Sequence, residues 1–261
     1  MLDACPRRSA TILLNVGCAP ATLRDMRLRV AAIAMWLAST SLACGDGASL
    51  RVEFFGDEIH EFSWWEMYEI RRIALDAVGE ARRYLPGLSP ELYLRVHPAR
   101  TRDVIAETGE SGSAATPSTV VWQVDPTRPG GVAAVAKSAL RACLFHELHH
   151  LVRDAIVTRA TVLDASVTEG MASVFERDYA QATVPWAAYT AEEAKPWVDE
   201  LRQLPPDAER GSWLLRHPDG RRWIAFKAGA YLVDRAMHAS GKSAAELVTM
   251  PTDEILRLAG H

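Results

Sequence analysis

Short alternating apolar runs lie in the first half of the chain, and apolar residues at helical spacing dominate the second half. The alternating and β-branched runs predict strands over residues 51–55, 91–96 and 118–124. The helical spacing predicts helices over residues 62–84, 132–154, 163–179, 222–239 and 243–259, the last broken at Pro251. Residues 101–119 are rich in Gly, Ser and Thr and predict a helix start followed by a loop. Because strands come first and helices follow, the order predicts an α+β fold.

The residues ahead of the first predicted strand have the layout of an export signal. Arg27 and Arg29 precede residues 30–43, which carry no charge and are too few to span a membrane. This pattern predicts a secretory signal peptide at residues 26–44. The alternative is an ordinary buried N-terminal helix, because the apolar run also has the length of a helix.

The predicted signal ends at Cys44, and the residues around it resemble the cleavage box of bacterial lipoproteins. They depart from that box because Leu42 stands two places before the cysteine rather than three. The resemblance implies export to the bacterial periplasm or the cell surface, with a lipid anchor at Cys44 as one outcome. Residues 1–25 precede a well-formed signal, so we expect them to be an annotation extension ahead of a true start at Met26. The remaining residues, 45–261, show no repeat or long linker and predict one domain.

Composition and charge narrow the function classes. The 261 residues are 49% hydrophobic and 24% charged, which suits a soluble chain with a sizeable core. The formal net charge is −4 and the two signs are interspersed, so nothing predicts a nucleic-acid partner. The four cysteines show neither a C-x-x-C pair nor even spacing, which argues against a cysteine zinc site and a disulfide framework.

Residues 146–150, His-Glu-Leu-His-His, match the pattern H-E-x-x-H inside the predicted helix 132–154. Residues four apart lie on one face of a helix, so the imidazoles of His146 and His150 can reach one metal ion. Glu147 is then placed to act as general base on a zinc-activated water. The motif therefore indicates a zinc-dependent hydrolase.

A catalytic zinc takes three protein ligands and keeps one position open, so a third ligand must come from elsewhere. Residues 168–172, Thr-Glu-Gly-Met-Ala, supply it, because Glu169 lies 19 residues after His150 at the head of an apolar helical run. This separation lets the first helix end and a second helix return the carboxylate to the metal. The alternative for Glu169 is a solvated or helix-capping glutamate.

The combination of HELHH with a downstream Thr-Glu-Gly-Met-Ala resembles the glutamate-ligand zincins, or gluzincins, and within them a bacterial family of predicted zinc-dependent proteases. The resemblance covers mainly residues 118–240. It implies a zincin-like fold, with a small mixed sheet upstream of the HExxH helix and a mainly helical C-terminal part. It also implies one Zn²⁺ per chain and a peptide or protein substrate, bound along a strand edge for which residues 118–124 are the candidate.

The sequence departs from the zincin pattern at one position. Many such enzymes carry an aspartate four residues after the third ligand to orient a histidine, and here that position holds Ser173. The orienting group is then a backbone carbonyl or one of three carboxylates, those of Asp154, Asp164 and Glu176. The resemblance also implies an oxyanion donor from the C-terminal part, for which we favour Tyr231 over His238. The alternative for Tyr231 is a packing role on its helix.

These residues predict a zinc metallopeptidase, and three alternatives stay open. The first is a zinc hydrolase of a non-peptide amide or ester, which the same ligands would serve. The second is a surface lipoprotein whose zincin fold serves binding only, against which the presence of Glu147 argues. The third is a helical protein with a chance motif. Within the motif helix, we expect His149 to face away from the metal and Cys143 to be a core residue.

Overall fold

The computed structural model of the chain describes residues 42–44 and 48–261. The expected extension at residues 1–25 and nearly all of the expected signal peptide lie outside the described residues. Export and a lipid anchor at Cys44 therefore stay predictions. Within the described part of the chain, no helix combines the length and the apolar character that crossing a bilayer requires.

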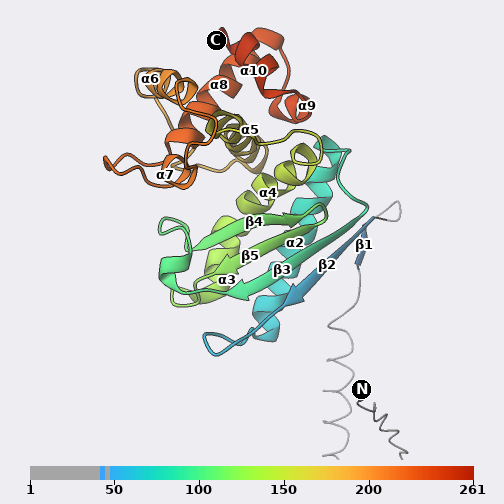
Figure 1. Ribbon diagram of the computed structural model, residues 1–261. Coiled ribbons are helices and arrows are strands. Elements are labelled where there is room, and N and C mark those ends of the chain that lie inside the picture. The colour runs from blue at the N-terminus through green and yellow to red at the C-terminus, as the bar shows by residue number, and fades with distance from the viewer. Residues whose placement is uncertain (1–41, 45–47) are drawn as a thin grey trace, which may run out of the picture. The chain divides into compact units, whose positions relative to one another are not determined.

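Five strands form one mixed sheet with the order β1-β2-β3-β5-β4 (Figure 1). Their bounds are β1 Leu42–Cys44, β2 Ala48–Phe54, β3 Glu91–Pro98, β4 Glu110–Thr116 and β5 Thr119–Val124. The three inner strands are parallel, whereas β1 and β4 run antiparallel to their neighbours at the two edges. Residues on one face of β3 and β5 are buried, including Leu94, Val96 and Trp122. This face is the part of the sheet that carries the core.

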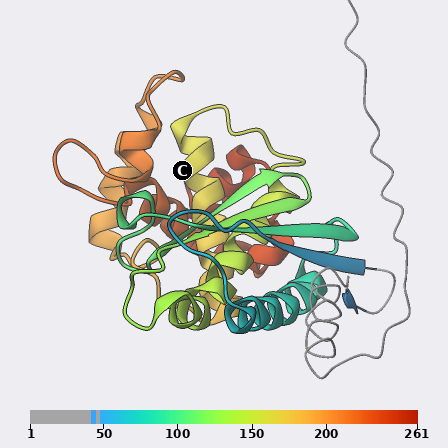
Figure 2. The same ribbon diagram turned by 90° about the horizontal axis from the view of Figure 1, so that it is seen from below.

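Helix α2 (Trp64–Tyr84) begins at a capping box, in which Ser63 and Glu66 satisfy each other's backbone N–H groups. A second helical segment runs through α3 (Gly131–Val135), a π-helical turn (Ala136–Leu140) and α4 (Arg141–Arg153). Figure 2 shows α2 and the start of this second segment side by side beneath the sheet. Their apolar residues close the core against β3 and β5.

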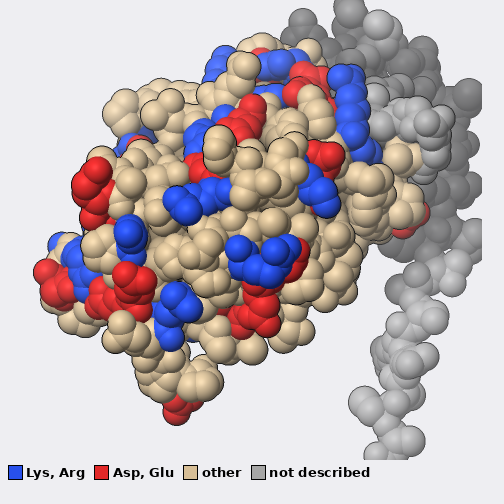
Figure 3. All heavy atoms as spheres, turned by 90° about the horizontal axis from the view of Figure 1, so that it is seen from above, with Lys and Arg blue, Asp and Glu red and all other residues tan. Residues whose placement is uncertain are grey.

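The C-terminal helices gather beyond the β4 edge of the sheet (Figure 1). Their bounds are α5 Val162–Ala180, α6 Ala191–Arg202, α7 Gly211–Leu214, α8 Ile224–Ser240, α9 Ala244–Leu247 and α10 Thr252–Ala259. Apart from α2, which lies between β2 and β3, the strands precede the helices, and this arrangement is consistent with the α+β class. The face seen in Figure 3 carries acidic and basic side chains interspersed, as the sequence pattern indicates.

Helices α5 and α8 cross with their backbones in direct contact. A Cβ atom on Gly229 would lie 1.8 Å from the backbone oxygen of Ser166, and one on Gly170 would lie 2.0 Å from the carbonyl carbon of Gly229. The hydroxyl of Ser166 donates a hydrogen bond of 2.6 Å to the carbonyl of Ala225. Only glycine therefore fits at both positions, and the crossing fixes α5 immediately beside Glu169.

A fully buried arginine ties α4 to the C-terminal helices. Arg153 donates to the hydroxyl of Thr168 on α5 and to the carbonyls of Val248 and Met250, at 3.1, 2.9 and 2.9 Å. Burial lowers the pKa of this guanidinium to about 10. The hydroxyl and carbonyl dipoles offset part of the cost of burying the charge, because they replace some of the hydrogen bonds that water would supply, while Nη2 has no partner among the described residues.

The sequence prediction is wrong at the edge of the sheet. A short 3-10 helix, η2 (Thr101–Asp103), does begin the segment of residues 101–119, but the edge strand β4 lies where a loop is expected. Strand β4 is built of small and polar residues without β-branched alternation, so periodicity does not mark it. The expected edge at residues 118–124 is β5, which lies between β3 and β4. Helix α6 is also not predicted from the sequence. Pro196 lies inside this helix, and a proline normally indicates a helix end.

The α5–α8 crossing gives a prediction for stability. Gly229→Ala forces a methyl group into backbone atoms, so we expect the free energy of unfolding to fall by about 2 kcal/mol or more. Gly79→Ala is the matched control, because a Cβ at that position inside α2 meets nothing within 4 Å. The control should raise the free energy of unfolding by about 0.5–1 kcal/mol. Urea denaturation measures both, and equal effects of the two substitutions would refute the close crossing.

Candidate metal centre

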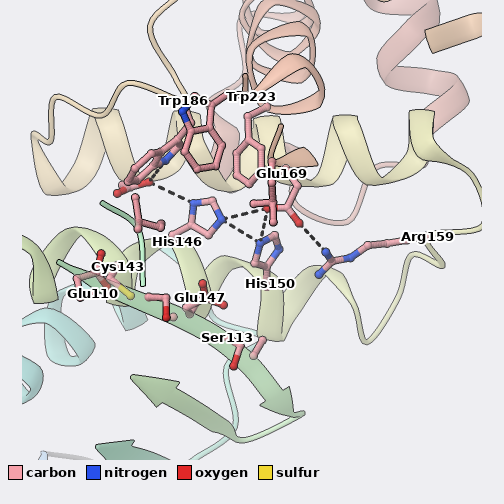
Figure 4. Close-up of a pocket in the computed structure, with 17 residues that line it drawn as sticks. Glu110, Ser113, Cys143, His146, Glu147, His150, Arg159, Glu169, Trp186 and Trp223 are labelled. Carbon is pink, nitrogen blue, oxygen red and sulfur yellow. Dashed lines mark hydrogen bonds and ion pairs between the residues drawn. The ribbon is translucent and has the colours of Figure 1, made fainter. Parts of the chain in front are cut away.

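Three side chains from two helices converge beside the edge strand β4. His146 and His150 of α4 and Glu169 of α5 offer ligand atoms that all lie within 4.8 Å of one another (Figure 4). The Nε2 atoms of His146 and His150 are 3.0 Å apart. Oε2 of Glu169 lies 3.2 Å from Nε2 of His146 and 3.1 Å from Nε2 of His150. The structure thus brings together the three residues that the sequence predicts as ligands.

The spacing of these atoms fits a zinc ion. Zinc–nitrogen and zinc–oxygen distances of about 2.0–2.1 Å in a tetrahedron place neighbouring ligand atoms about 3.3 Å apart. The observed separations of 3.0–3.2 Å are close to that value. Two imidazole nitrogens and one carboxylate oxygen are also the donor set of a catalytic rather than a structural zinc. The three residues can therefore hold a divalent cation.

The second ring nitrogen of His146 is held by a carboxylate. Nδ1 of His146 lies 3.2 Å from Oε2 of Glu176, which also accepts a hydrogen bond of 3.1 Å from the indole of Trp186. A proton on Nδ1 leaves Nε2 free as a ligand, so Glu176 sets the tautomer that metal binding needs. Glu176 is one of the three carboxylates that the sequence offers for this role. Of the other two, Asp164 caps α5 and Asp154 binds Arg159.

The predicted base, Glu147, lies against the edge strand β4. A Cβ atom on Gly112 of β4 would come within 2.8 Å of the side chain of Glu147 and within 2.5 Å of the sulfur of Cys143. Glycine at this position therefore lets the strand pass close over the helix. Burial raises the pKa of the Glu147 carboxyl, although the two nearby imidazoles oppose the shift. Cys143 is a buried core residue, as expected, and it also lines the cavity.

The three ligands and Glu147 open into one cavity of about 390 Å³. Residues of β4 from Glu110 to Ala114 form one wall of this cavity. An aromatic wall, defined by Trp186, Trp223 and Phe226, also lines the cavity near the ligands. Figure 4 shows the two tryptophans, and the ring of Phe226 stacks on that of His146 at 6.1 Å. The remaining lining side chains include Ile105, Arg159 and Leu215. The cavity therefore joins a strand edge, an apolar surface and the ligand cluster.

Glu110 is a site residue that the sequence analysis misses. Its carboxylate accepts a hydrogen bond of 2.9 Å from the indole of Trp122 and lies beside the thiol of Cys143. Burial raises the pKa of this carboxyl to about 7, against the opposing effect of its hydrogen bonds. Arg159 is missed for a similar reason. Both residues lie in segments without a recognisable motif, and no signal in a single sequence marks either one.

The structure places Tyr231 and His238 away from the ligand cluster. Both line a second cavity of about 330 Å³, together with Tyr189 and Asp234. The rings of Tyr231 and Tyr189 pack edge to face at 5.8 Å. The expectation that Tyr231 donates to an oxyanion is therefore wrong. Tyr231 is instead a packing residue on its helix, the alternative that the sequence left open. His149 does face away from the cluster, because its ring packs on Phe175 at 5.4 Å.

The raised pKa of Glu110 predicts a pH dependence of stability. Because the folded-state pKa lies above the ordinary value of 4.5, the fold favours the neutral carboxyl. The neutral carboxyl therefore adds to the free energy of unfolding. This stabilisation is complete below about pH 4.5 and is lost as the pH rises through about 7. Between pH 5 and pH 8, the wild type should therefore lose about 2 kcal/mol more unfolding free energy than Glu110→Gln.

Urea denaturation in the presence of a chelator measures this difference without a contribution from metal binding. Glu91→Gln, at an exposed position of β3, controls for the loss of one carboxylate. Parallel profiles for the wild type and Glu110→Gln would contradict the shift at Glu110.

Comparison with known protein families agrees with this geometry. A family model described as "Predicted Zn-dependent protease (DUF2268)" matches residues 73–257, well over half of the chain. The matched segment contains the motif helix α4, the third ligand on α5 and the edge strand β4. No curated protein matches the chain at a significant level. The chain therefore belongs to the family of predicted Zn-dependent proteases.

Proposed function

We propose that the protein is a zinc-dependent metallopeptidase that hydrolyses peptide bonds in an extended substrate. The observation that carries the proposal is the convergence of His146, His150 and Glu169 beside the buried carboxyl of Glu147 in one cavity. The family to which the chain belongs is described as predicted Zn-dependent proteases. This description supports the proposal independently of the geometry.

The two imidazole Nε2 atoms and Oε2 of Glu169 would hold the ion. When bound, zinc supplies a Lewis acid that polarises a carbonyl and lowers the pKa of water toward neutrality. Glu176 keeps His146 in the tautomer that leaves Nε2 unprotonated. The chain thus contributes both the ligands and the group that orients one of them.

Glu147 moves the proton in the proposed reaction. Its carboxylate accepts a proton from the attacking water and later donates it to the leaving amine. Burial, which raises the pKa of this carboxyl, suits a group that must hold a proton between two steps. The close passage of Gly112 above Glu147 limits the room for water around the carboxyl.

The edge strand β4 supports a peptide as the substrate. Among the described strands, β4 pairs only with β5, and beyond a bridge between Glu110 and Ile105 its other edge is unpaired beside the cavity. An extended peptide can add to such an edge through backbone hydrogen bonds, with side chains reaching pockets on alternate positions. The aromatic wall of Trp186, Trp223 and Phe226 then suits an apolar side chain. A small non-peptide amide or ester would make no use of the edge.

Metal analysis and a peptidase assay test the proposal together. We expect about one zinc per chain in the wild type, loss of the zinc in Glu169→Ala, and retention of the zinc in Glu147→Gln. Because Glu147 carries the proton, its replacement should lower the rate of cleavage of unfolded casein by about 100- to 10,000-fold. Elemental analysis and the release of peptides measure the two effects separately.

Glu192→Gln is the control, because Glu192 is exposed on α6 and does not line the cavity. It should retain both the zinc and the activity. The proposal fails if the wild type holds no zinc after supplementation, or if Glu147→Gln cleaves casein at the wild-type rate.

A further inference from the structure

Arg159 places a guanidinium against the third ligand. Among the described residues that line the cavity, it is the only lysine or arginine. It lies in the connection between α4 and α5, where only Asp154 is considered in the sequence analysis. Nη1 of Arg159 donates a hydrogen bond of 2.7 Å to Oε1 of Glu169 (Figure 4). This contact is made to the carboxylate oxygen that does not face the imidazoles.

The two oxygens of Glu169 therefore have different partners. Oε2 faces the Nε2 atoms of His146 and His150, and Oε1 is taken by Arg159. A carboxylate held in this way offers one oxygen to a metal ion rather than two. A catalytic zinc with three protein ligands needs its fourth position free for water or substrate. A second oxygen from Glu169 would compete for that position.

The guanidinium is itself fixed from the opposite side. Nε and Nη2 of Arg159 both donate to the carboxylate of Asp154, the residue that caps α4, with Nε at 2.9 Å from Oδ1. Such a two-point contact sets the plane of the guanidinium, which a single ammonium group cannot match. Arg159 thus joins the end of the motif helix to the ligand on α5.

The backbone beside the guanidinium is held as well. Arg210 donates from Nη2 to the carbonyls of Arg159 and Ala160, each at 2.7 Å. The connection between α4 and α5 therefore has a fixed position on the cavity wall. The side chain of Arg159 is 26% exposed, so its contacts to Asp154 and Glu169 are partly shielded from water.

We propose that Arg159 is a positioning residue that holds Glu169 to one-oxygen ligation and keeps the fourth coordination position free. The inference rests on the proposed zinc site, and it adds a role for a residue outside the motif. It depends on the hydrogen bond to Oε1 and on the two-point anchor at Asp154, and not on the net charge of Arg159.

A charge-neutral double variant tests orientation apart from charge. Arg159→Ala with Asp154→Asn removes one positive and one negative charge, so the net charge near the ion is unchanged. We expect the dissociation constant for Zn²⁺, measured by competition with a chromophoric chelator, to rise about 10- to 100-fold. With Co²⁺ in place of zinc, the visible absorption should weaken, because cobalt absorbs less as its coordination number rises.

The matched control is Arg177→Ala with Asp234→Asn. Arg177 lies on α5 and, like Arg159, makes a two-point contact with an aspartate, at 2.9 and 2.8 Å, but it does not line the cavity. This control should leave the zinc affinity and the cobalt spectrum unchanged. Arg159→Lys is a milder second variant, should the double variant fail to fold. Lysine keeps the positive charge but cannot make the two-point contact of a guanidinium. We therefore expect a smaller loss of zinc affinity and a smaller loss of cobalt absorption than in the double variant.

Two results would overturn the inference. If the folded Arg159 variants bind Zn²⁺ with wild-type affinity and give the wild-type cobalt spectrum, Arg159 does not position Glu169, although the zinc site itself stands. If the wild type binds neither Zn²⁺ nor Co²⁺ at the cluster, the proposed function fails and the inference fails with it.

Discussion

The position of α5 against α4 is the constraint on which the site depends. Two ligands come from α4 and one from α5, and their atoms lie 3.0–3.2 Å apart, so a shift of one helix by an ångström would separate them. Three independent contacts hold this position. Arg153 ties α4 to Thr168, Arg159 ties the end of α4 to Glu169, and α8 packs directly on Gly170. Each contact is made at Glu169 or at a residue next to it.

The electrostatics of the cavity follow from this packing. Four glutamates line it, at positions 110, 147, 169 and 176, and all four are buried. Burial of several carboxylates is costly unless cations or hydrogen-bond donors compensate them. Arg159, the imidazoles and the indoles of Trp122 and Trp186 provide part of the compensation. A divalent cation held by His146, His150 and Glu169 would supply more positive charge at the centre of the cluster.

Sequence reasoning predicts the parts of the site that short motifs carry. The helical period places His146 and His150 on one face, and the distance along the chain to Glu169 allows a helix to return it to the same point. The same reasoning predicts the α+β order and most of the helices, because their apolar periods are long. Glu176 stands among several candidates in the sequence, and only the packing of α5 on α4 selects it.

Other parts depend on contacts that no local pattern records. Strand β4 has small residues because it passes close over α4, and this closeness removes the β-branched signal of a strand. Helix α8 is buried on several sides, so its apolar pattern does not tell which face Tyr231 occupies. Arg159 lies in a connection between helices, where position is set by Asp154 and Arg210 rather than by a period. Sequence alone therefore gives the ligands but not the residues that arrange them.

X-ray absorption at the zinc edge of the purified protein reports the atoms bound to the ion and so tests the proposed ligand set. We expect only nitrogen and oxygen neighbours at about 2.0–2.1 Å, with the outer-shell scattering of two imidazole rings. A sulfur neighbour at about 2.3 Å would instead indicate a cysteine ligand such as Cys143. That result, or a first shell without imidazole, would contradict the site formed by His146, His150 and Glu169.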